Sequence, residues 1–295
     1  MTLRTESTDE RIRIFDGETL LASYRFKTWQ SKPYFEHVAL PADCGEHAGE
    51  NLVLVCPHDH VWHFGLWFAQ KRVDEINFWE VEALRVEKSK PYGECVHVSL
   101  FDVKPHSDKC VAFGQRIDWV SEHGEKILEE RRTIEVHAPR DRAYRIDWTI
   151  ELKAIGQERK LNSWGRWGHY SGLCWRPIRS LYGGDWMNAE FEYFWNVTAE
   201  RSKWCDFTGK LDRSPVFLKP EQAGMTMFDH PGNPGYPTRW YAVYEPFAFM
   251  NANRTYNSEF PIAKDATTTW RYGVFVHYGA ADRARIEAEY ARYAG

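Results

Sequence analysis

Residues 144–152, Tyr-Arg-Ile-Asp-Trp-Thr-Ile-Glu-Leu, decide the fold class of this 295-residue chain. Every even-numbered position in this stretch is apolar or aromatic, and every odd-numbered position is polar. Successive side chains of a β-strand point to opposite faces of the sheet. The alternation therefore predicts a strand with one buried face and one solvent-facing side.

The same alternation, less regular, recurs along most of the chain. It predicts further strands at residues 11–15, 20–26, 34–40, 51–56, 95–103, 115–120, 133–138, 239–244 and 270–278. One helix is predicted at residues 281–293, where Ile286, Tyr290 and Tyr293 follow helical spacing. So many strands with so few helices predict an all-β fold, a large antiparallel β-sandwich with a short C-terminal helix.

No repeat, low-complexity tract or flexible linker divides the sequence. A single β-sandwich domain spanning residues 1–295 is therefore predicted. Residues 156–235 are rich in Gly, Trp, Asn and Pro, and this composition predicts a long loop region. Long loop regions inside a compact domain usually carry function.

Composition excludes several classes of partner. The chain has 38 Lys and Arg residues against 42 Asp and Glu residues, and no segment concentrates the basic ones, so nucleic acid is not an expected partner. No apolar run approaches the roughly 20 residues that cross a bilayer, and residues 1–15 lack the apolar region of a signal peptide. The sequence predicts a cytoplasmic protein without membrane contact, and it leaves the oligomeric state open.

The six cysteines are spread widely and include no Cys-x-x-Cys pair. A chain of this size does not need disulfides for stability, so mostly buried free thiols are predicted. They stand at positions 44, 56, 95, 110, 174 and 205.

Aromatic residues indicate the class of ligand. The chain contains 14 Trp, 15 Tyr and 17 Phe, and many of them stand beside His, Asn, Asp or Arg. Most of these rings are expected in the core, because aromatic side chains bury large areas. A sugar also needs such neighbours, since its ring offers an apolar C–H face and its hydroxyls need polar partners. A small-molecule carbohydrate is the predicted ligand.

Residues 57–68, PHDHVWHFGLWF, place His58, His60 and His63 around Asp59 after an apolar run. Pro57 ends or diverts that run, so these side chains are expected at a strand end, where they can converge. Three interpretations remain open. The histidines could bind a divalent metal, with Asp59 orienting a ring. One or two could transfer protons, or all three could hydrogen-bond the backbone of a buried turn.

A second cluster lies at residues 228–240, FDHPGNPGYPTRW. Its prolines and glycines fix a rigid, irregular backbone that can support site residues. Asp229, His230 and Asn233 are its polar side chains, and Arg239 can bind a carboxylate or a hydroxyl pair. The alternative is an Asp- or Asn-capped turn between strands.

A third cluster, residues 162–176, offers His169, Tyr170 and Arg176 among close-packing glycines. Glu80 is a further candidate, whereas His137 alternates out of phase with its apolar neighbours and is predicted to be an exposed surface residue. The sequence contains no glycine-rich phosphate loop, dinucleotide fingerprint or Gly-x-Ser-x-Gly elbow. A nucleotide cofactor and serine-hydrolase chemistry are therefore disfavoured.

Four elements together resemble the bacterial family catalogued as PmoA-like. They are Asp-His-x-x-His-x-Gly-Leu-Trp-Phe from Asp59, Asn-Phe-Trp-Glu from Asn77, Ser-Gly-Leu-x-x-Arg from Ser171, and Phe-Asp-His-Pro-x-Asn-Pro from Phe228. The resemblance implies a β-supersandwich like that of galactose mutarotases, in bacteria that degrade sugars. The methane-oxygenase subunit that the family name suggests is excluded, because such a subunit needs several apolar spans.

This sequence departs from the family pattern within the first element. The family commonly shows Pro-His-His-Arg after the first Asp-His, whereas Val61-Trp62-His63-Phe64 stands here. Trp62 replaces a histidine and Phe64 an arginine. If either supplied a metal ligand or a carboxylate clamp, the resemblance implies a less acidic or differently shaped substrate for this protein.

The leading hypothesis is a carbohydrate-active enzyme that cleaves a sugar or keto-glycoside by β-elimination or hydrolysis, or isomerises it as a mutarotase or epimerase does, through acid–base chemistry. A non-catalytic sugar-binding or regulatory protein is the alternative. The sequence identifies no cofactor, and a divalent metal at His58, His60 and His63 stays open. The predicted catalytic residues are His60, His63, His230, Asp59 and Asp229, and the predicted substrate contacts are Trp79, Glu80, His169, Arg176, Asn233 and Arg239.

Overall fold

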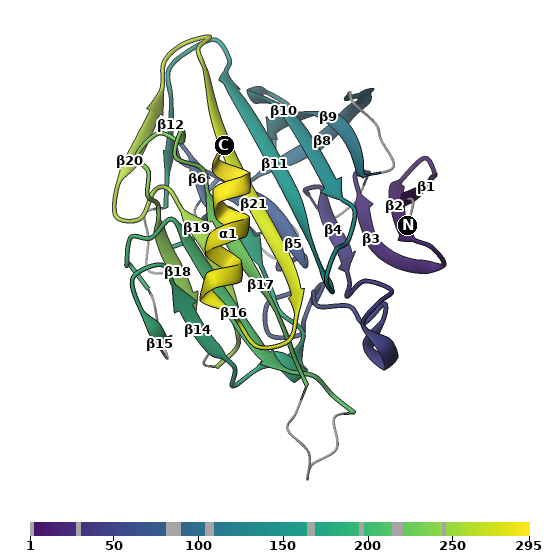
Figure 1. The fold of residues 1–295 in the computed structure, drawn as a ribbon. Helices are drawn as coiled ribbons and strands as arrows, with labels where there is room; N and C mark the ends of the chain where they lie inside the picture. The colour runs from purple at the N-terminus through teal and green to yellow at the C-terminus, as the bar shows by residue number, and fades with distance from the viewer. Residues whose placement is uncertain are drawn as a thin grey trace.

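Antiparallel strands form most of the protein in the computed structural model (Figure 1). The structure describes residues 3–27, 31–80, 90–103, 109–163, 169–194, 198–213, 221–243 and 246–295. Within them the strands form an eight-stranded, a nine-stranded and a four-stranded sheet.

The 57–68 stretch leads into the fifth strand of the eight-stranded sheet, which begins at Leu66. The strands of this sheet, in spatial order, are β1 (Leu3–Ser7), β2 (Arg11–Asp16), β3 (Thr19–Arg25), β4 (Tyr34–Val38), β5 (Leu66–Gln70), β13 (Ser171–Trp175), β19 (Phe249–Asn253) and β18 (Arg239–Val243).

The nine-stranded sheet contains the longest strands. In spatial order they are β15 (Glu192–Phe194), β14 (Asp185–Asn188), β16 (Trp204–Lys210), β17 (Gln222–Asp229), β21 (Thr267–Tyr278), β11 (Ala143–Ala154), β10 (Lys126–His137), β9 (Cys110–Ser121) and β8 (Gly93–Asp102).

The remaining elements are small. The four-stranded sheet has the order β20 (Glu259–Ile262), β12 (Arg159–Asn162), β6 (Arg72–Val73) and β7 (Ile76–Asn77). Two 3₁₀ turns, η1 (Gly45–His47) and η3 (Arg179–Leu181), and the helix α1 (Arg283–Ala294) complete the described elements.

The main hydrophobic core lies between the two large sheets. The rings of Tyr24 and Phe35, from the eight-stranded sheet, lie 6.4 and 5.5 Å from the ring of Trp148 in β11. From Tyr144 to the end of β11 the even-numbered residues are buried and the odd-numbered ones are partly exposed, as the alternation requires. The predicted all-β antiparallel sandwich with a short C-terminal helix is confirmed.

Helix α1 covers the outer face of the nine-stranded sheet (Figure 1). The carboxylate of Asp282 accepts hydrogen bonds from the backbone nitrogens of Ala284 and Arg285, at 2.9 and 3.2 Å, and so caps the helix. Ile286 and Tyr290 are buried in the cluster beneath it. The helix predicted at residues 281–293 is confirmed, shifted by one or two residues.

The prediction of a long loop region at residues 156–235 is wrong, because β12 to β17 lie within it. Strands β13, β16 and β17 are buried along almost their whole length. Alternation of polar and apolar residues appears only when one face of a strand meets water. Strands covered on both faces therefore escape recognition by that pattern.

The strand predicted at residues 51–56 is also wrong, since only isolated bridges form there, between Ala39 and Asn51, Val53 and Pro177, and Val55 and Phe64. The Asn51 carboxamide bonds the backbone of Val53 instead, through both its oxygen and its nitrogen. The last residue of the strand predicted at residues 239–244, residue 244, lies outside the described residues.

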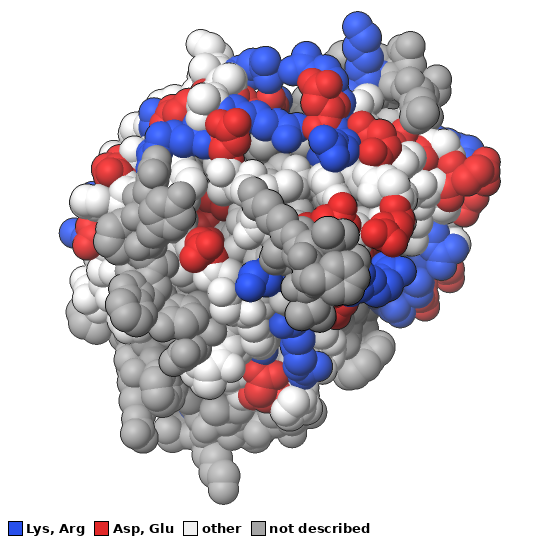
Figure 2. Space-filling model, turned by 60° about the horizontal axis from the view of Figure 1, so that its bottom comes forward, with Lys and Arg blue, Asp and Glu red and all other residues white. Residues whose placement is uncertain are grey.

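The six thiols are free, and four of them are buried, which confirms that prediction. Within the described ranges no helix has the length and apolar character to cross a membrane. Lys and Arg intermingle with Asp and Glu on the face shown in Figure 2, and the described side chains on that face form no extended basic area. A nucleic-acid surface, which gathers basic residues, is not indicated.

Candidate functional site

The histidine-rich stretch folds as a compact turn on the outer face of the eight-stranded sheet. Three main-chain hydrogen bonds close it, from the nitrogens of Cys56, His60 and His63 to the oxygens of His63, Pro57 and His60 at 2.8, 3.0 and 2.9 Å. The turn leads directly into β5. His60 and His63 consequently stack on each other, with ring centroids 4.8 Å apart.

An aromatic floor lies beneath this turn. It is a second apolar cluster, separate from the main core, on the outer face of the eight-stranded sheet. Strand alternation creates it, because neighbours such as Leu66 and Phe68 point into the main core while Trp67 points outward. Its buried rings are Tyr34, Phe64, Trp67, Trp79, Tyr170, Phe247 and Phe249.

His63 is fully buried against this floor, with 0% of its surface exposed. Its ring stacks on Phe249 at 4.9 Å. Burial, together with the nearby positive charge of Arg176, holds the pKa of His63 well below its ordinary value of 6.5, so the ring is neutral. Nδ1 accepts from Arg176 at 3.2 Å, which places the proton on Nε2, and Nε2 has no hydrogen-bond partner among the described residues.

Arg176 connects the turn to the end of β13. Its guanidinium donates to Asp59 Oδ2 at 2.5 Å, to His63 Nδ1 at 3.2 Å and to the Tyr182 hydroxyl at 3.1 Å. It also lies 4.3 Å from the ring of Phe247. Arg176 was predicted to contact substrate, and the structure places it 1% exposed, holding the other site residues in position.

Asp59 and His60 form a dyad at the solvent edge of the site, with side chains 30% and 24% exposed. His60 Nδ1 lies 3.1 Å from Asp59 Oδ2. Partial burial opposes ionisation of Asp59, but hydrogen bonds from Arg176 and His60 outweigh it and lower its pKa to about 2. Partial burial lowers the pKa of His60 below 6.5, although Asp59 opposes this shift.

His58 does not join the other two histidines. It is exposed, and its Nδ1 accepts a hydrogen bond from Arg179 at 3.0 Å. Among the described residues, two groups of three potential metal ligands lie close together, and neither includes His58, His60 or His63. The structure therefore lends no geometric support to the metal interpretation of this turn.

Glu80 belongs to a buried ionic group beside the aromatic floor. Its carboxylate accepts from Lys71 Nζ at 2.6 and 2.7 Å and from Asn77 Nδ2 at 2.7 Å. Lys32 lies nearby, fully buried, and donates to the backbone oxygen of Trp79 at 2.7 Å. Desolvation lowers the pKa of Lys32 to about 8. Trp79, a predicted substrate contact, is itself 0% exposed and stacks on Tyr170 at 4.8 Å.

His169 lies at the edge of the floor, next to Tyr241. Its ring stacks on Tyr256 at 4.7 Å and lies 5.1 Å from Tyr241, and all three rings are partly exposed. Tyr241 in turn meets Tyr170 at 5.5 Å, so these rings are continuous with the floor. Residues 164–168 of the third predicted cluster lie outside the described residues.

The 228–240 cluster lies elsewhere in the fold. Asp229, at the end of β17, is 0% exposed and accepts from Asn233 Nδ2 and from the backbone nitrogen of Thr238, both at 2.7 Å. Burial nevertheless raises the pKa of Asp229 to about 6. Asn233 also bonds both backbone groups of Arg271. These hydrogen bonds are those of a turn capped by Asp and Asn side chains, which was the alternative interpretation of this cluster.

The structure does not bring the two histidine motifs together. His230 packs edge-on against Tyr293 of α1 at 5.4 Å, and its Nδ1 accepts from the backbone nitrogen of Gly232 at 2.9 Å. Helix α1 covers the outer face of the nine-stranded sheet, whereas His60 and His63 lie on the outer face of the other sheet. Arg239 begins β18 of the eight-stranded sheet and donates to the backbone oxygen of Ala199 at 2.6 Å. It lines a small cavity of about 220 Å³ that Tyr256 also lines.

Comparison with protein families gives a match over residues 11–291 to a family described as "Family of unknown function (DUF6807)". The chain belongs to this family. The match carries that description and not the PmoA-like one that the four motifs implied. No curated protein matches this DUF6807 chain.

One solved structure similar to the DUF6807 protein is the alpha-galactosidase from Lactobacillus brevis. The similarity has a TM-score of 0.31 and 9% sequence identity, over 95% of this chain and 39% of that one. The present chain thus spans about two fifths of the length of that enzyme.

Sequence reasoning missed several residues of the candidate site. Lys32 and Lys71 are buried cations next to the aromatic floor, and Phe247 and Phe249 pack directly on His60 and His63. No local pattern marks them, because the two lysines stand at strand ends and the two phenylalanines are separated from the histidines by more than 180 residues.

Proposed function

We propose that this protein is a carbohydrate-active enzyme that isomerises a sugar, or eliminates the aglycone from a keto-glycoside, by proton transfer through His60. The observation that carries the proposal is the Asp59–His60 dyad at the solvent edge of an aromatic surface. The Nδ1–H group of His60 donates to Asp59, which leaves the lone pair on Nε2 available as a base. Because its pKa lies below 6.5, His60 is neutral and able to accept a proton at neutral pH.

Arg176 holds this arrangement in place through its hydrogen bonds to Asp59 and His63. Its ion pair keeps Asp59 ionised, and the carboxylate then holds the His60 ring in one tautomer. The same guanidinium donates to His63, whose neutral ring stacks beneath His60. Buried partners of this kind fix the orientation of a catalytic side chain.

The carboxylates of the site favour proton transfer over hydrolysis. Glycoside hydrolases generally use two carboxyl groups, one of which must donate a proton. Among the described residues of this site the second carboxylate is Glu80, which is buried and bonded to Lys71 and Asn77. Asp59, with its pKa near 2, stays ionised at neutral pH and is a poor proton donor.

Two reactions suit a histidine base. In an elimination, His60 removes the proton from the carbon next to the carbonyl, and the electron pair forms an enolate. The enolate re-forms the carbonyl as the aglycone oxygen leaves from the β-carbon, with a new C=C bond. In a mutarotation, His60 takes the proton of the anomeric hydroxyl while an acid protonates the ring oxygen.

The partly exposed rings supply a surface for a sugar. The ring of Trp62 lies 5.4 Å from that of His60. The rings of Tyr241, His169 and Tyr256 form a second group at the edge of the aromatic floor. Stacking of a sugar on such rings needs no charge on the ligand. This supports a neutral sugar or glycoside as the substrate class.

The test uses the purified full chain with two sets of substrates. Mutarotation of free aldoses is followed by polarimetry, and release of aglycone from 3-keto-glucosides by chromatography. Turnover of one set is expected, and His60→Gln should reduce it by about 100-fold or more. His123→Gln is the matched control, because His123 is exposed on a hairpin of the other sheet and should leave the rate unchanged.

Two results would reject the enzyme. Sugar binding without turnover of any substrate supports the alternative, a non-catalytic sugar-binding protein. Turnover that His60→Gln leaves intact removes the dyad from the mechanism.

A further inference from the structure

A second cluster of chemically reactive side chains lies on the outer face of the nine-stranded sheet. In the antiparallel register of β9 and β10, His137 stands directly opposite Cys110, and Glu135 precedes His137 by two residues on the same face. The Cys110 sulfur, a Glu135 carboxylate oxygen and a ring nitrogen of His137 all lie within 4.8 Å of one another. All three side chains are partly buried.

We infer that Cys110, Glu135 and His137 form a binding site for a zinc-like divalent metal ion. Thiolate, imidazole and carboxylate are the ligands that Zn²⁺ takes in proteins, and a soft sulfur ligand argues against Mg²⁺ or Ca²⁺. A tetrahedral Zn²⁺ holds such ligand atoms roughly 3.3–3.8 Å apart, so small side-chain rotations would close the site. Three protein ligands leave a fourth position for water or another ligand.

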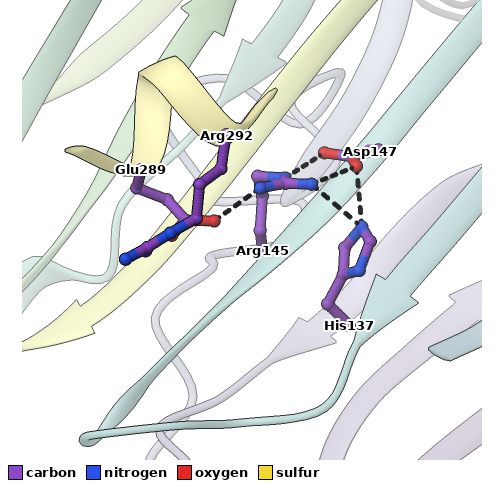
Figure 3. Close-up of polar contacts among 5 residues, drawn as sticks. All are labelled: His137, Arg145, Asp147, Glu289 and Arg292. Atoms are coloured by element: carbon purple, nitrogen blue, oxygen red, sulfur yellow. Dashed lines mark hydrogen bonds and ion pairs between the residues drawn. The ribbon is translucent and has the colours of Figure 1, made fainter. Parts of the chain in front are cut away.

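The surroundings of His137 resemble those of a metal-binding histidine. Its Nε2 lies 2.7 Å from Asp147 Oδ2 and 3.3 Å from Arg145 Nη2 (Figure 3). In the tautomer that the closer carboxylate favours, Nε2–H donates to Asp147 and the lone pair is on Nδ1. A hydrogen bond from a ligating histidine to a carboxylate is a regular feature of metal sites. His137, predicted from the sequence to be an exposed surface residue, is therefore a half-buried and oriented one.

Arg145, two residues before Asp147 in β11, fixes the Asp147 carboxylate, and a glutamate of α1 pairs with Arg145. Arg145 donates to both carboxylate oxygens of Asp147, at 2.6 and 2.9 Å, and pairs with Glu289 at 2.5 Å (Figure 3). Arg292 contacts the other oxygen of Glu289 at 2.6 Å. These contacts hold in place the carboxylate that orients His137.

The other group of potential ligands, Glu46, His47 and Glu221, differs in one decisive respect. His47 already pairs through both ring nitrogens, with Glu50 at 2.5 Å and Glu221 at 2.6 Å. Short contacts to a carboxylate at each ring nitrogen leave neither nitrogen of His47 open to a metal. Among the described residues, the Cys110 group is thus the better ligand set.

All three residues of the Cys110 group are partly exposed to solvent. His137 lines a surface groove of about 920 Å³ that extends over Lys109, Arg145 and the α1 residues Arg285, Glu289 and Arg292. The long, regular strands β9 and β10 hold the ligands on a rigid framework. The groove also leaves room for a small anionic or neutral molecule at the fourth position.

The test titrates the chelator-treated full chain with Co²⁺ and Zn²⁺. Cobalt bound through a thiolate gives a sulfur-to-metal charge-transfer band in the near ultraviolet, and Zn²⁺ should displace it at one equivalent. Cys110→Ser and His137→Ala should abolish the band. Asp147→Asn, which removes only the orienting carboxylate, should weaken affinity by about 10- to 100-fold. Cys56→Ser is the matched control, a partly buried thiol outside the nine-stranded sheet, and should leave the band intact.

A second readout does not depend on variants that fold poorly. In the wild-type chain, Zn²⁺ should slow iodoacetamide alkylation of Cys110, measured by peptide mass spectrometry, and leave that of Cys56 unchanged. A wild-type chain without a charge-transfer band and without protection of Cys110 overturns the inference. So does a band that persists with unchanged affinity in Cys110→Ser.

Discussion

Arg176 and Asp59, 117 residues apart in the sequence, form an ion pair with 2.5 Å between Nη2 and Oδ2. Arg176 is almost completely buried, whereas Asp59 reaches the solvent edge. The pair therefore anchors the histidine-bearing turn to the residue that follows β13. The orientation of His60 depends on a residue from a different motif.

Replacing Arg176 by Met should lower the free energy of unfolding by about 2 kcal/mol, because Asp59, His63 and Tyr182 each lose a hydrogen-bond donor. Hydrogen bonds to charged groups contribute more to stability than those between neutral groups. Urea unfolding measures the change. Arg179→Met is the matched control: Arg179 is 52% exposed, 3.9 Å from Asp59, and its loss should cost less than about 0.5 kcal/mol. Equal losses in the two variants would contradict the anchoring role of Arg176.

The acid stability of the protein should reflect the same pair. The pKa of Asp59 is lowered to about 2, so its contribution to the free energy of unfolding is fully present above its ordinary pKa of 3.8 and is lost as pH falls from 3.8 toward 2. The difference in unfolding free energy between wild type and Asp59→Asn should stay constant above about pH 5 and shrink below about pH 4. A difference that grows on acidification contradicts the lowered pKa.

The fold could be predicted from the sequence where strands have one solvent-facing side. Residues 144–152 gave a correct strand because the outer face of β11 is partly exposed. Strands β5, β13 and β16 are covered on both faces and show no alternation. The 51–56 run is apolar enough for a strand, but side-chain hydrogen bonds of Asn51 replace the ladder there.

The site could be predicted only in part, because pairing between distant segments leaves no local signal. The 57–68 stretch is rich in histidine, and its residues Asp59, His60 and His63 do lie together. That Arg176 joins them follows from the pairing of β13 with β5, which sequence spacing cannot show. Equally, Asp229 and His230 have the composition of a site, but β17 carries them to the other sheet.

The 228–240 cluster is expected to stabilise the fold and to take no part in catalysis. Asn233→Ala removes hydrogen bonds to Asp229 and to both backbone groups of Arg271, and should cost about 2–3 kcal/mol. His230→Ala loses one bond to Gly232 at a partly exposed position and should cost less than about 1 kcal/mol. Both are measured by urea unfolding, and both variants should retain the rate of the wild type on the sugar substrates. A His230→Ala variant that folds normally but turns over no substrate would place His230 in the chemistry instead.

The Lys71–Glu80 pair should show the cost of a buried charge. Its side chains are 3% and 6% exposed, so Glu80→Gln takes the counter-charge from a buried ammonium and should cost about 3–5 kcal/mol. The double variant Lys71→Met, Glu80→Leu removes both charges and should be more stable than Glu80→Gln alone. Urea unfolding of Lys71→Met, of Glu80→Leu and of the double variant gives the coupling energy directly. Additive losses would show that the pair is not coupled.

The pH dependence of turnover tests the Asp59–His60 dyad most directly. A base with its pKa below 6.5 is neutral above that pH, so kcat should be level from about pH 6.5 to 8 and fall on acidification. Asp59 opposes the lowering of the His60 pKa, so in Asp59→Asn the acid limb should move to still lower pH. The plateau of that variant should drop by about 10²- to 10⁴-fold, because asparagine no longer fixes the tautomer of the ring. His123→Gln should reproduce the wild-type profile, and an acid limb that moves upward in Asp59→Asn would contradict the assignment of His60 as the base.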